Sequence, residues 1–389
     1  MRIALVHEWL LTYGGSEEIT AELQRLFPEA DQFALLADPV PALRARLDGR
    51  DIRTTFLQRL PGATRWHRLL LPLLPAAVAS LDLRVYDLVI SVSHAVAKSV
   101  RTGPRQVHLC ICCSPMRYAW DLREAYLRET RLDRGVRGWI ARRMLDGLRR
   151  WDRSTADRPT EYLAISEFIG ERISRAYGRS ARILYPPVDT DFFRPAMDGE
   201  RSPEEPYWLT ASRFVPYKRI PLIVEAFAAM PSRRLLVVGD GPERPRVEAV
   251  ARNTANVTML GQVPRVRLRE LLQGARGFVF AAEEDFGIAP VEAMACGVPV
   301  VAYGKGGARE TVQGDPTTLG STGVYFESQT VESIREGVES LEAAWAAGRI
   351  TAAACRARAE RFSSDAFRAG VRAEVARVTA HLAQTVASS

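Results

Sequence analysis

Short apolar runs that alternate with segments of helical character are the feature that most constrains how this chain can fold. Nearly continuous apolar strands between helices are typical of parallel sheets that are covered on both faces. Their repetition along the chain predicts a doubly wound α/β architecture. The runs are residues 2–7, 32–37, 86–93, 106–113, 161–166 and 182–188 in the first half, and 207–212, 233–240, 256–261, 277–282, 299–303 and 323–326 in the second.

The alternation is interrupted at residues 186–206, which are rich in proline and charge and have no periodicity. For 389 residues, two domains are the natural expectation at about 100–200 residues each. We predict an N-terminal Rossmann-like domain over 1–188, a linker over 189–206, and a second Rossmann-like domain over 207–364. Ligands are expected at the carboxyl ends of the strands, in a cleft between the two domains.

The C-terminal segment predicts a helix over residues 365–386, which we expect to join the N-terminal domain. Ser363 or Ser364 can cap this helix. Its apolar residues recur at helical spacing and share one face; they are Phe367, Val371, Val375 and Val378.

Composition narrows the class of protein. The net charge of +7 and the pI of about 9.3 favour anionic partners such as nucleotides, phospholipid surfaces or nucleic acid. The N-terminus does not resemble a signal peptide, and the apolar stretch 69–81 contains two prolines and is too short to span a bilayer. An odd number of cysteines, five, favours a reducing cytoplasm. Cys110, Cys112 and Cys113 have no second Cys/His pair at matching spacing, so we interpret them as part of a buried strand.

Two loops could hold an anion. Gly14 and Gly15 follow the first strand, and a helix is expected from Glu17, so the backbone there could approach a diphosphate; a plain turn explains the same residues. Arg213 and Lys218 follow the strand 207–212 and could hold a pyrophosphate; a solvated cationic loop is the alternative.

Three further patterns are too weak to be assigned to a ligand. The stretch 237–243 resembles half of a dinucleotide fingerprint, but Arg244 stands at the third glycine position. The stretch 304–307, Gly-Lys-Gly-Gly, lacks the spacing of a phosphate-binding loop. The pair Asp189 and Asp191 has metal-binding spacing but lies in the predicted linker, so we do not assign it to a metal.

The stretch 283–307 carries two glutamates, Glu284 and Glu292, on either side of a Phe-Gly-Ile-Ala-Pro turn. Glu284 is expected in the loop after a strand and Glu292 in the first turn of the next helix, with Pro290 in that turn and Gly297 as its C-cap. Acid/base chemistry, a clamp for ligand hydroxyls, and ordinary helix-dipole stabilisation all remain open for these acids.

The Glu284–Glu292 motif with the following "AMACGVPVVA" resembles glycosyltransferase family 4, the retaining nucleotide-sugar transferases of the GT-B fold. "SRFVPYKR", "VVGDGPE", "LGQVP" and "GGSEE" occur in the matching order along nearly the whole chain. "HAVAKSV", "PMRYAWD" and "YPPVD" are similar to the branch of O-antigen and exopolysaccharide mannosyltransferases that use GDP-mannose.

The resemblance implies roles for individual residues. Glu292 would bind the ribose of the donor, and Glu284 a sugar hydroxyl. Arg213 and Lys218 would hold the diphosphate and offset the charge of the leaving group, and they, with Glu284, are the expected catalytic residues. Other expected donor contacts are Gly14, Gly15, Gly239, Val263, Phe286, Gly287 and Ile288.

The resemblance also implies that no metal and no cofactor is needed besides the nucleotide-sugar substrate, because the two cations stabilise the leaving group. One position departs from the pattern. Many members of the family carry a histidine where this chain has Cys113, and a cysteine cannot reproduce the hydrogen bonds of an imidazole. His94, Cys113 and Arg117 are therefore candidates on the acceptor side.

Residues 131–153 contain eight arginines and three aspartates, with Trp139, Ile140 and Trp151 among them. This composition suits an interfacial helix on anionic lipid; an amphipathic helix with a solvated basic face explains it equally well. A lipid-linked acceptor and a peripheral position on the inner face of the plasma membrane would fit the first explanation.

The sequence thus predicts a retaining glycosyltransferase that transfers mannose from GDP-mannose to a lipid-linked or polysaccharide acceptor in cell-surface glycan biosynthesis, without nucleic acid as a partner. Three alternatives stay open: a UDP-sugar donor, a glycosidase using Glu284 and Glu292, and a donor-binding module with weak or no catalysis.

Overall fold

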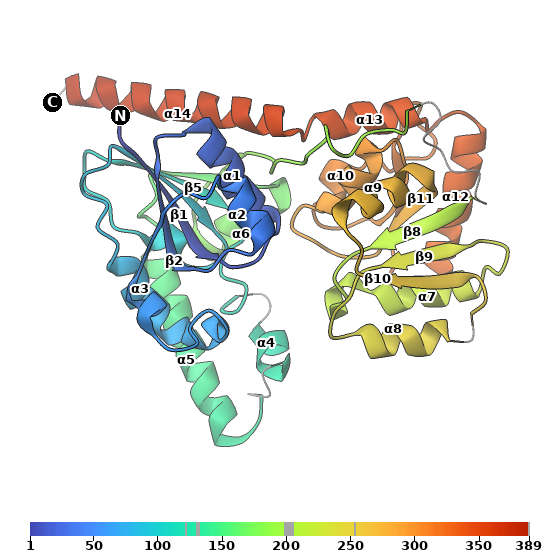
Figure 1. Cartoon of the computed structure of the whole chain (residues 1–389), viewed down its shortest axis with the longest axis horizontal. Coiled ribbons are helices and arrows are strands. Elements are labelled where there is room, and N and C mark those ends of the chain that lie inside the picture. Colours follow the sequence, from blue (N-terminus) through green and yellow to red (C-terminus); the bar gives the residue numbers. More distant parts are fainter. Residues whose placement is uncertain (121–122, 130–132, 198–205, 253, 388–389) are drawn as a thin grey trace. The chain divides into compact units, whose positions relative to one another are not determined.

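The computed structural model describes residues 1–120, 123–129, 133–197, 206–252 and 254–387. The chain forms two compact units (Figure 1), one of Met1–Pro187 with Phe367–Ser389 and one of Val188–Ala366. Each unit contains one parallel β-sheet with helices packed on it. This confirms the predicted α/β architecture of two Rossmann-like domains. Of the predicted linker, residues 198–205 lie outside the described residues.

The sheet of the first unit has seven strands in the order β3-β2-β1-β4-β5-β6-β7. From β1 the chain moves outward in one direction and from β4 in the other, so the topological switch point lies between the carboxyl ends of β1 and β4. The strands are β1 (Ile3–Leu10), β2 (Asp31–Ala37), β3 (Ile52–Thr54), β4 (Leu88–Ser93), β5 (Val107–Cys112), β6 (Glu161–Ala164) and β7 (Arg182–Ile183).

The helices of the first unit bury one face against this sheet. In the C-terminal helix, Gly370 leaves room for Leu184, because a Cβ at this glycine would lie 2.6 Å from that side chain. The α-helices are α1 (Gly15–Leu26), α2 (Pro41–Arg46), α3 (Leu74–Ala79), α4 (Arg123–Glu129), α5 (Gly135–Ser154), α6 (Glu167–Tyr177) and α14 (Ser364–Ala387); short 3-10 turns are η1 (Phe56–Arg59), η2 (His67–Leu73) and η3 (Ala97–Ser99).

The sheet of the second unit has six strands in the order β10-β9-β8-β11-β12-β13, which places its switch point between β8 and β11. The strands are β8 (Tyr207–Ala211), β9 (Leu235–Val238), β10 (Val257–Gly261), β11 (Ala275–Phe280), β12 (Val300–Tyr303) and β13 (Gly323–Phe326). The helices are η4 (Pro216–Lys218), α7 (Ile220–Ala228), α8 (Arg244–Ala251), α9 (Arg265–Gly274), α10 (Ile288–Ala295), α11 (Ala308–Thr311), α12 (Val331–Ala346) and α13 (Ala352–Glu360).

Three sequence-based expectations were wrong in detail. The short edge strand β3 was missed, because its three residues, Ile-Arg-Thr, contain a single apolar side chain. Helix α1 begins at Gly15, two residues before Glu17. Helix α10 begins at Ile288, because Gly287 adopts a left-handed conformation with φ of 89° just before it. Glu292 therefore stands in the second turn of α10, one turn later than predicted.

Other local expectations are confirmed. The backbone N–H of Ala366 donates to Ser363 Oγ at 3.2 Å, and the predicted apolar face of α14 is buried. Cys110 and Cys112 are buried within β5, as the buried-strand interpretation requires, and each of the five cysteines is a free thiol. Among the helices of the described chain, we find none with the length and apolarity that crossing a bilayer demands.

Candidate active site

The loops after β8 and β11 meet at the switch point of the second sheet. Lys218, the last residue of η4, forms an ion pair with Glu284, which lies in the loop after β11. The side chain of Lys218 is 14% exposed and that of Glu284 is 17% exposed, so the pair is largely enclosed but accessible to solvent. The ammonium also lies 5.6 Å from the centre of the Phe280 ring. Two residues that the sequence places in separate motifs are therefore direct partners.

Two hydrogen bonds through Gln329 also connect the loops at this switch point. Arg219 Nε donates to Gln329 Oε1 at 3.1 Å, and Gln329 Nε2 donates to the carbonyl oxygen of Ala281 at 2.8 Å. Arg219 has φ of 56°, a left-handed conformation that residues other than glycine seldom adopt. Such strain persists where surrounding contacts hold it, and it gathers at functional sites. Arg213, two residues beyond β8, is exposed and forms no ion pair with another residue that the structure describes.

The glycines of the Gly-Asp-Gly stretch allow two loops to pack together. A Cβ at Gly239 would lie 1.8 Å from the carbonyl oxygen of Ser212, and one at Gly241 would lie 2.5 Å from that of Phe214. The N–H of Phe214 donates to the carbonyl of Asp240 at 2.8 Å. The structural role of Gly239 is therefore to support the loop that carries Arg213; its predicted contact with the donor stays a prediction.

The Gly-Lys-Gly-Gly stretch does the same for the loop of Glu284. A Cβ at Gly307 would lie 2.3 Å from Phe286 Cα, and the Gly307 N–H donates to the carbonyl of Glu284 at 2.8 Å. Phe286 is buried and its ring lies 5.4 Å from that of Phe362. Close packing thus accounts for these glycines, as the absence of phosphate-loop spacing in the sequence indicated.

The remaining predicted donor contacts lie along the same carboxyl edge of the second sheet. Gly287 and Ile288 form the start of α10, and Glu292 is partly buried within that helix. Val263 follows β10 and is partly buried. In contrast, Asp189 forms an ion pair with Arg265 at 3.0 Å and caps a local turn, which supports the decision not to assign it to a metal.

The switch point of the first sheet holds a second carboxylate–cation pair. Glu8 lies within β1 and is fully buried. Its Oε1 accepts from the Ser93 hydroxyl at 3.0 Å and from four successive backbone N–H groups, those of residues 94–97, at 2.9 to 3.1 Å. His94 Nδ1 lies 3.0 Å from the other oxygen, Oε2. The sequence analysis missed Glu8, although an acid inside an apolar strand was a usable signal, because such an acid needs partners.

Electrostatics keep this pair charged. Burial alone would raise the pKa of Glu8, but His94 and the backbone donors outweigh burial and hold that pKa well below its usual range. Burial likewise opposes the charged form of His94, yet the nearby Glu8 carboxylate raises the His94 pKa above its ordinary value. The neighbouring His7 has its pKa lowered by burial and is neutral.

Cys113 and Arg117 follow β5 at the same edge of the first sheet. Burial raises the pKa of the Cys113 thiol well above its ordinary value, so the thiol is neutral and a poor nucleophile. Arg117 Nε lies 3.4 Å from Ser114 Oγ. The charges of Glu8, Glu17 and Arg117 all act on Cys113, which places these groups in one neighbourhood.

The Gly14-Gly15 loop also lies at this edge. Gly14 has no side chain to cap α1, and the Glu17 carboxylate folds back over it, because a Cβ at Gly14 would lie 3.1 Å from Glu17 Oε2. The Ser16 hydroxyl donates to the same carboxylate at 3.0 Å. The helix N-terminus therefore faces one of its own acids, and the expected contacts of Gly14 and Gly15 with a diphosphate stay a prediction.

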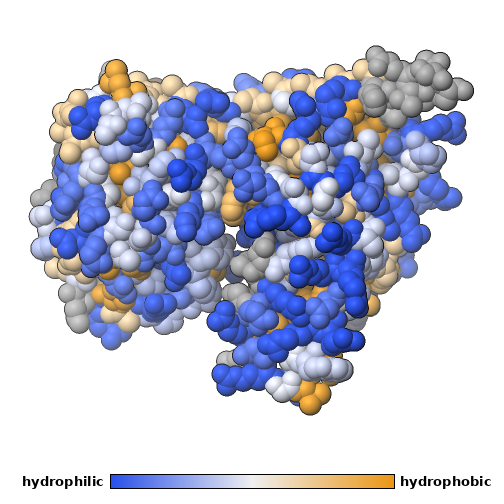
Figure 2. Space-filling model, turned by 180° about the vertical axis from the view of Figure 1, so that it is seen from behind, coloured by the Kyte–Doolittle hydropathy of each residue, from blue (hydrophilic) through white to orange (hydrophobic). Residues whose placement is uncertain are grey.

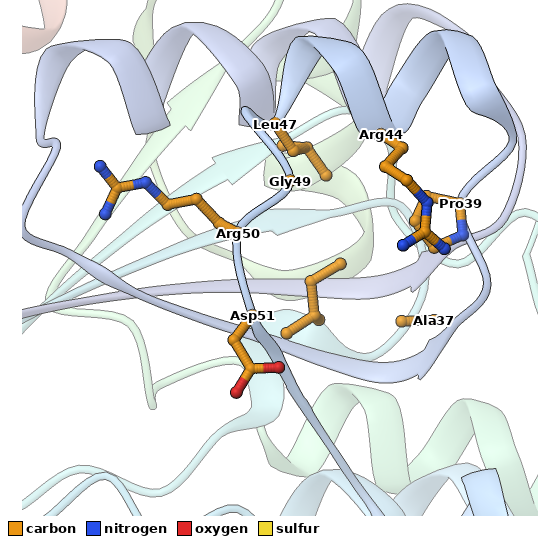
Figure 3. Close-up of a pocket in the computed structure, with 8 residues that line it drawn as sticks. Ala37, Pro39, Arg44, Leu47, Gly49, Arg50 and Asp51 are labelled. Carbon is orange, nitrogen blue, oxygen red and sulfur yellow. The ribbon is translucent and has the colours of Figure 1, made fainter.

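A cavity of about 170 Å³ lies elsewhere in the first unit, beside α2. Figure 3 shows that Arg44 lies beside Pro39 whereas Arg50 points away from both, so the two guanidinium groups do not converge. None of the site residues expected from the sequence lines this cavity.

Comparison with known proteins finds one family model that matches most of the second unit. Residues 196–361 match the family described as "Glycosyl transferases group 1". This match covers the segments that carry Arg213, Lys218, Glu284 and Glu292.

Among curated proteins, the chain is 32% identical over 203 residues to the GDP-mannose-dependent alpha-(1-6)-phosphatidylinositol monomannoside mannosyltransferase of Mycolicibacterium smegmatis. The alignment covers 46% of this chain and 51% of that protein, so the chain spans about half the length of the curated relative that it matches.

Solved structures extend the likeness to nearly the whole chain. The crystal structure of Anabaena Alr3699/HepE in complex with UDP has a TM-score of 0.68 at 18% identity, covering 97% of this chain and 100% of that one. Sucrose-phosphate synthase from Thermosynechococcus elongatus has a TM-score of 0.71 at 19% identity, covering 98% and 100%. At such identities the likeness concerns the fold, and it confirms the predicted GT-B fold.

Proposed function

We propose that this protein is a retaining glycosyltransferase with a nucleotide-sugar donor, for which GDP-mannose is the first choice. The observation that carries the proposal is the Lys218–Glu284 pair at the switch point of the second sheet, inside the segment that matches glycosyl transferases group 1. The name of the mycobacterial relative supports GDP-mannose as the donor and a lipid-borne acceptor.

In this proposal the diphosphate of the donor lies between Arg213 and Lys218. Lys218 exchanges its contact with Glu284 for a phosphate oxygen, and Glu284 turns to a hydroxyl of the sugar. The Glu292 carboxylate accepts from the ribose hydroxyls, and the backbone near Phe286, Gly287 and Ile288 supplies N–H donors. Val263 contacts the base through its backbone.

The two cations would stabilise the leaving group when the bond between the sugar and the diphosphate of the donor breaks. The bond between the anomeric carbon and the diphosphate oxygen breaks, and negative charge develops on the diphosphate between Arg213 and Lys218, which stabilise it. The acceptor hydroxyl then bonds to the anomeric carbon on the same face, and its proton passes to the departing diphosphate. Anomeric configuration is thereby retained without a protein nucleophile and without a metal.

The direct test combines nucleotide release with the anomeric configuration of the product. We expect GDP release from GDP-mannose that depends on an acceptor such as octyl α-mannoside, and an α-linked product. An inverted product would contradict the mechanism, and failure to bind any nucleotide sugar would contradict the function.

Thermal-shift measurements with a panel of GDP and UDP nucleotides test which nucleobase the sugar donor carries. The proposal expects stabilisation by GDP at lower concentration than by UDP. Stronger stabilisation by UDP would favour the UDP-sugar alternative. Donor binding without turnover on any acceptor would favour the donor-binding module.

The role of Glu292 has its own test. Glu292→Gln keeps the shape of the side chain but weakens its hydrogen bonds to the ribose, so we expect about a tenfold loss of affinity for GDP, the scale of one lost charged hydrogen bond. Isothermal titration with GDP measures this loss, and the exposed Glu283→Gln is the matched control. A pure loss of turnover with GDP affinity intact would contradict the ribose contact.

We further propose that the first unit binds an anionic membrane through the start of α5, which projects from the body of that unit (Figure 1). Val136, Trp139 and Ile140 are exposed there by 75%, 64% and 54%, at the spacing of one helical face. Figure 2 shows an orange group at the tip of this projection, next to pale residues and with blue ones beyond them. Exposed Arg137 and Arg143 form no ion pair with another described residue, so their charges are available to lipid.

The opposite end of α5 is fixed to neighbouring helices and loops of the first unit. Asp152 forms a buried ion pair with Lys98 at 3.1 Å, and it accepts from Trp120 Nε1 at 2.8 Å and from the Tyr177 hydroxyl at 3.0 Å. A firmly held base suits a helix whose apolar tip enters a lipid surface. Residues 131–132 of the basic segment lie outside the described residues.

Vesicle sedimentation tests this proposal. Trp139→Glu should reduce binding to vesicles of phosphatidylglycerol and phosphatidylcholine at low salt by about tenfold or more, because it replaces an exposed indole, proposed to enter the lipid surface, by a charge. Val85→Glu, at an apolar position of the first unit that is 55% exposed, is the matched control. Equal loss in both variants, or no binding by the unaltered protein, would contradict a role for α5.

A further inference from the structure

Glu8 reaches His94 in two separate ways. Its Oε1 binds the backbone N–H groups of residues 94–97, which fixes the path of the chain after β4. Its Oε2 lies 3.0 Å from His94 Nδ1, which fixes the ring. The Trp9 ring also meets the His94 ring edge-on at 4.9 Å between centroids. Backbone and side chain of His94 are thus both held by β1.

The other ring nitrogen of His94 is available to a ligand. The His94 side chain is 23% exposed, and no hydrogen bond joins its Nε2 to another residue within the described part of the chain, whereas Nδ1 meets the Glu8 carboxylate as an ion pair and makes no other hydrogen bond there. His94 follows the carboxyl end of β4, at the switch point where doubly wound sheets bind ligands. An imidazole held at Nδ1 by a carboxylate, with Nε2 turned to a site, is an arrangement that orients a ring for hydrogen bonding or proton transfer.

A metal ion is a competing explanation that the hydrogen bonds disfavour. The donor atoms of His7, Glu8 and His94 all lie within 4.8 Å of one another. However, Glu8 Oε1 already accepts five N–H or O–H donors, and Oε2 accepts the His94 backbone N–H at 3.3 Å besides facing Nδ1. His7 Nδ1 accepts from the Trp9 N–H at 3.2 Å, so the neutral ring carries its proton on Nε2, which has no hydrogen-bond partner among the described residues and cannot bind a metal while protonated. We therefore assign none of the three as a metal ligand.

We propose that Glu8 is a positioning residue that holds His94 as a cationic hydrogen-bond donor, with Nε2–H directed at an oxygen of the acceptor substrate. This inference rests on the proposed function and on the expectation from the sequence that His94 lies on the acceptor side. A cationic ring donates at both nitrogens and accepts at neither. His94 then acts by binding and orienting a hydroxyl or phosphate oxygen of the acceptor, and it does not act as a general base.

The charged groups around His94 favour the donor role. Glu8 from β1 and Glu17 from α1 raise the His94 pKa, while Arg117, after β5, lowers it. His7, from β1, faces the ring at 5.6 Å between centroids and has its own pKa lowered by burial. The neighbouring Cys113 thiol has a raised pKa and stays neutral. Burial opposes the charged ring, but the carboxylates outweigh it, so the cation of His94 persists to higher pH than that of an ordinary imidazole.

The experiment pairs NMR with kinetics on the full chain. Titration of the histidine Cε1–H signals, five in the unaltered protein, should place the pKa of His94 above the ordinary value of about 6.5. In Glu8→Gln, which keeps an oxygen acceptor for the backbone, that pKa should fall. His67→Gln is the matched control, because His67 packs on Trp9 at 5.2 Å without contacting Glu8.

Kinetics with GDP-mannose and octyl α-mannoside then test the role. His94→Gln should lower kcat/KM for the acceptor about 10- to 100-fold, the scale of a lost charged hydrogen bond, and leave the Kd for GDP within about twofold. In the unaltered protein activity should fall on the alkaline side as His94 loses its proton, and in Glu8→Gln this fall should begin at lower pH.

Several results would overturn the proposal: a His94 pKa at or below the ordinary value, loss of GDP affinity rather than acceptor efficiency in His94→Gln, an activity that requires the neutral ring, or one equivalent of metal that His94→Gln removes. If no nucleotide sugar is turned over, the proposed function fails, while the NMR titration still decides whether Glu8 holds His94 as a cation. If Glu8→Gln does not fold, the His94 pKa of the unaltered protein and the His94→Gln kinetics decide.

Discussion

Each of the two switch points of this molecule contains a carboxylate paired with a cation, but the two pairs have different surroundings. In the first unit, Glu8 is fully buried and its oxygens accept from a hydroxyl and from successive backbone amides besides facing His94. In the second unit, Lys218 and Glu284 lie in loops and are each partly exposed. A carboxylate with many fixed partners would lose several hydrogen bonds if it moved to a ligand. A pair of partly exposed side chains can instead exchange a single contact for a ligand.

The difference originates in where each acid stands relative to its strand. Glu8 is within β1, and the chain leaving β4 folds over it. Glu284 is beyond the end of β11, in a loop that Gly306 and Gly307 allow to pack closely against the loop after β12. We infer that the first pair preserves a charge and that the second pair gives up its internal contact when a diphosphate binds.

The comparison is tested most strongly by removing Glu8. Glu8→Ala leaves the amides of residues 94–97 and the His94 cation without their common acceptor. Breaking a buried pair in this way should cost about 3–5 kcal/mol of unfolding free energy. Chemical denaturation of the full chain, with hydrogen exchange of the β4 amides reporting on the first unit, measures it.

The exposed Glu29→Ala is the matched control and should change stability by less than about 0.5 kcal/mol. A loss below about 1 kcal/mol in Glu8→Ala would mean that water replaces the carboxylate. The contrast between a fixed and an exchangeable pair would then disappear.

Replacing Lys218 should lower turnover strongly and stability only a little, whereas replacing Glu8 is expected to lower stability strongly. In Lys218→Met the proposed stabilisation of the leaving diphosphate is lost, so kcat should fall about 10²- to 10³-fold. Stability should change by less than in Glu8→Ala, because the Lys218–Glu284 pair remains accessible to water, which can solvate the Glu284 carboxylate once its partner is gone. Steady-state kinetics and denaturation of the same preparation measure the two quantities.

Lys305→Met is the control for Lys218. Lys305 is an exposed lysine that follows β12 at the same edge of the sheet, and its removal should change kcat by no more than a few fold. A large loss of stability in Lys218→Met without loss of turnover would show that the second pair, like the first, is structural.

Most of the fold could be predicted from residue patterns, because the position of a strand or helix depends mainly on residues that are neighbours in the sequence. Apolar runs such as 88–93 and 107–112 are buried on both faces of their sheet and therefore read as strands. The misplaced start of α10 shows the limit, because a glycine that adopts a left-handed conformation determined the boundary, whereas the proline pattern favoured a later start.

The candidate site was predictable only where each residue belongs to a motif that can be recognised locally in the sequence. Arg213, Lys218 and Glu284 stand in recognisable loops after strands. Glu8 escaped notice because its partners lie 85 to 89 positions away, and their N–H groups converge only after β1 and β4 pair. Similarly, the sequence could not show that Gly239 and Gly307 are required for loop packing.

The smallest expected effect concerns the pH dependence of stability in the first unit. The pKa of Glu8 is lowered in the folded chain, so its contribution is present above the unfolded value of about 4.3 and is lost as pH falls. The pKa of His94 is raised, so its contribution is full below the unfolded value of about 6.5 and is lost as pH rises through the folded value. The stability advantage of the unaltered protein over His94→Gln should therefore be larger at pH 6 than at pH 9.

The difference between the two proteins is the quantity to measure, because His7 and His108 act in the opposite direction. Burial lowers the pKa of both rings, so each contributes stability above the unfolded value of about 6.5 that is lost as pH falls. The His108 contribution is common to the unaltered protein and His94→Gln and cancels when their Tm values are subtracted at each pH. The His7 contribution cancels only in part, because the charge of His94 is one of the causes that lower the His7 pKa. If His67→Gln produced the same pH-dependent difference, packing on Trp9 would account for the effect instead of the ion pair with Glu8.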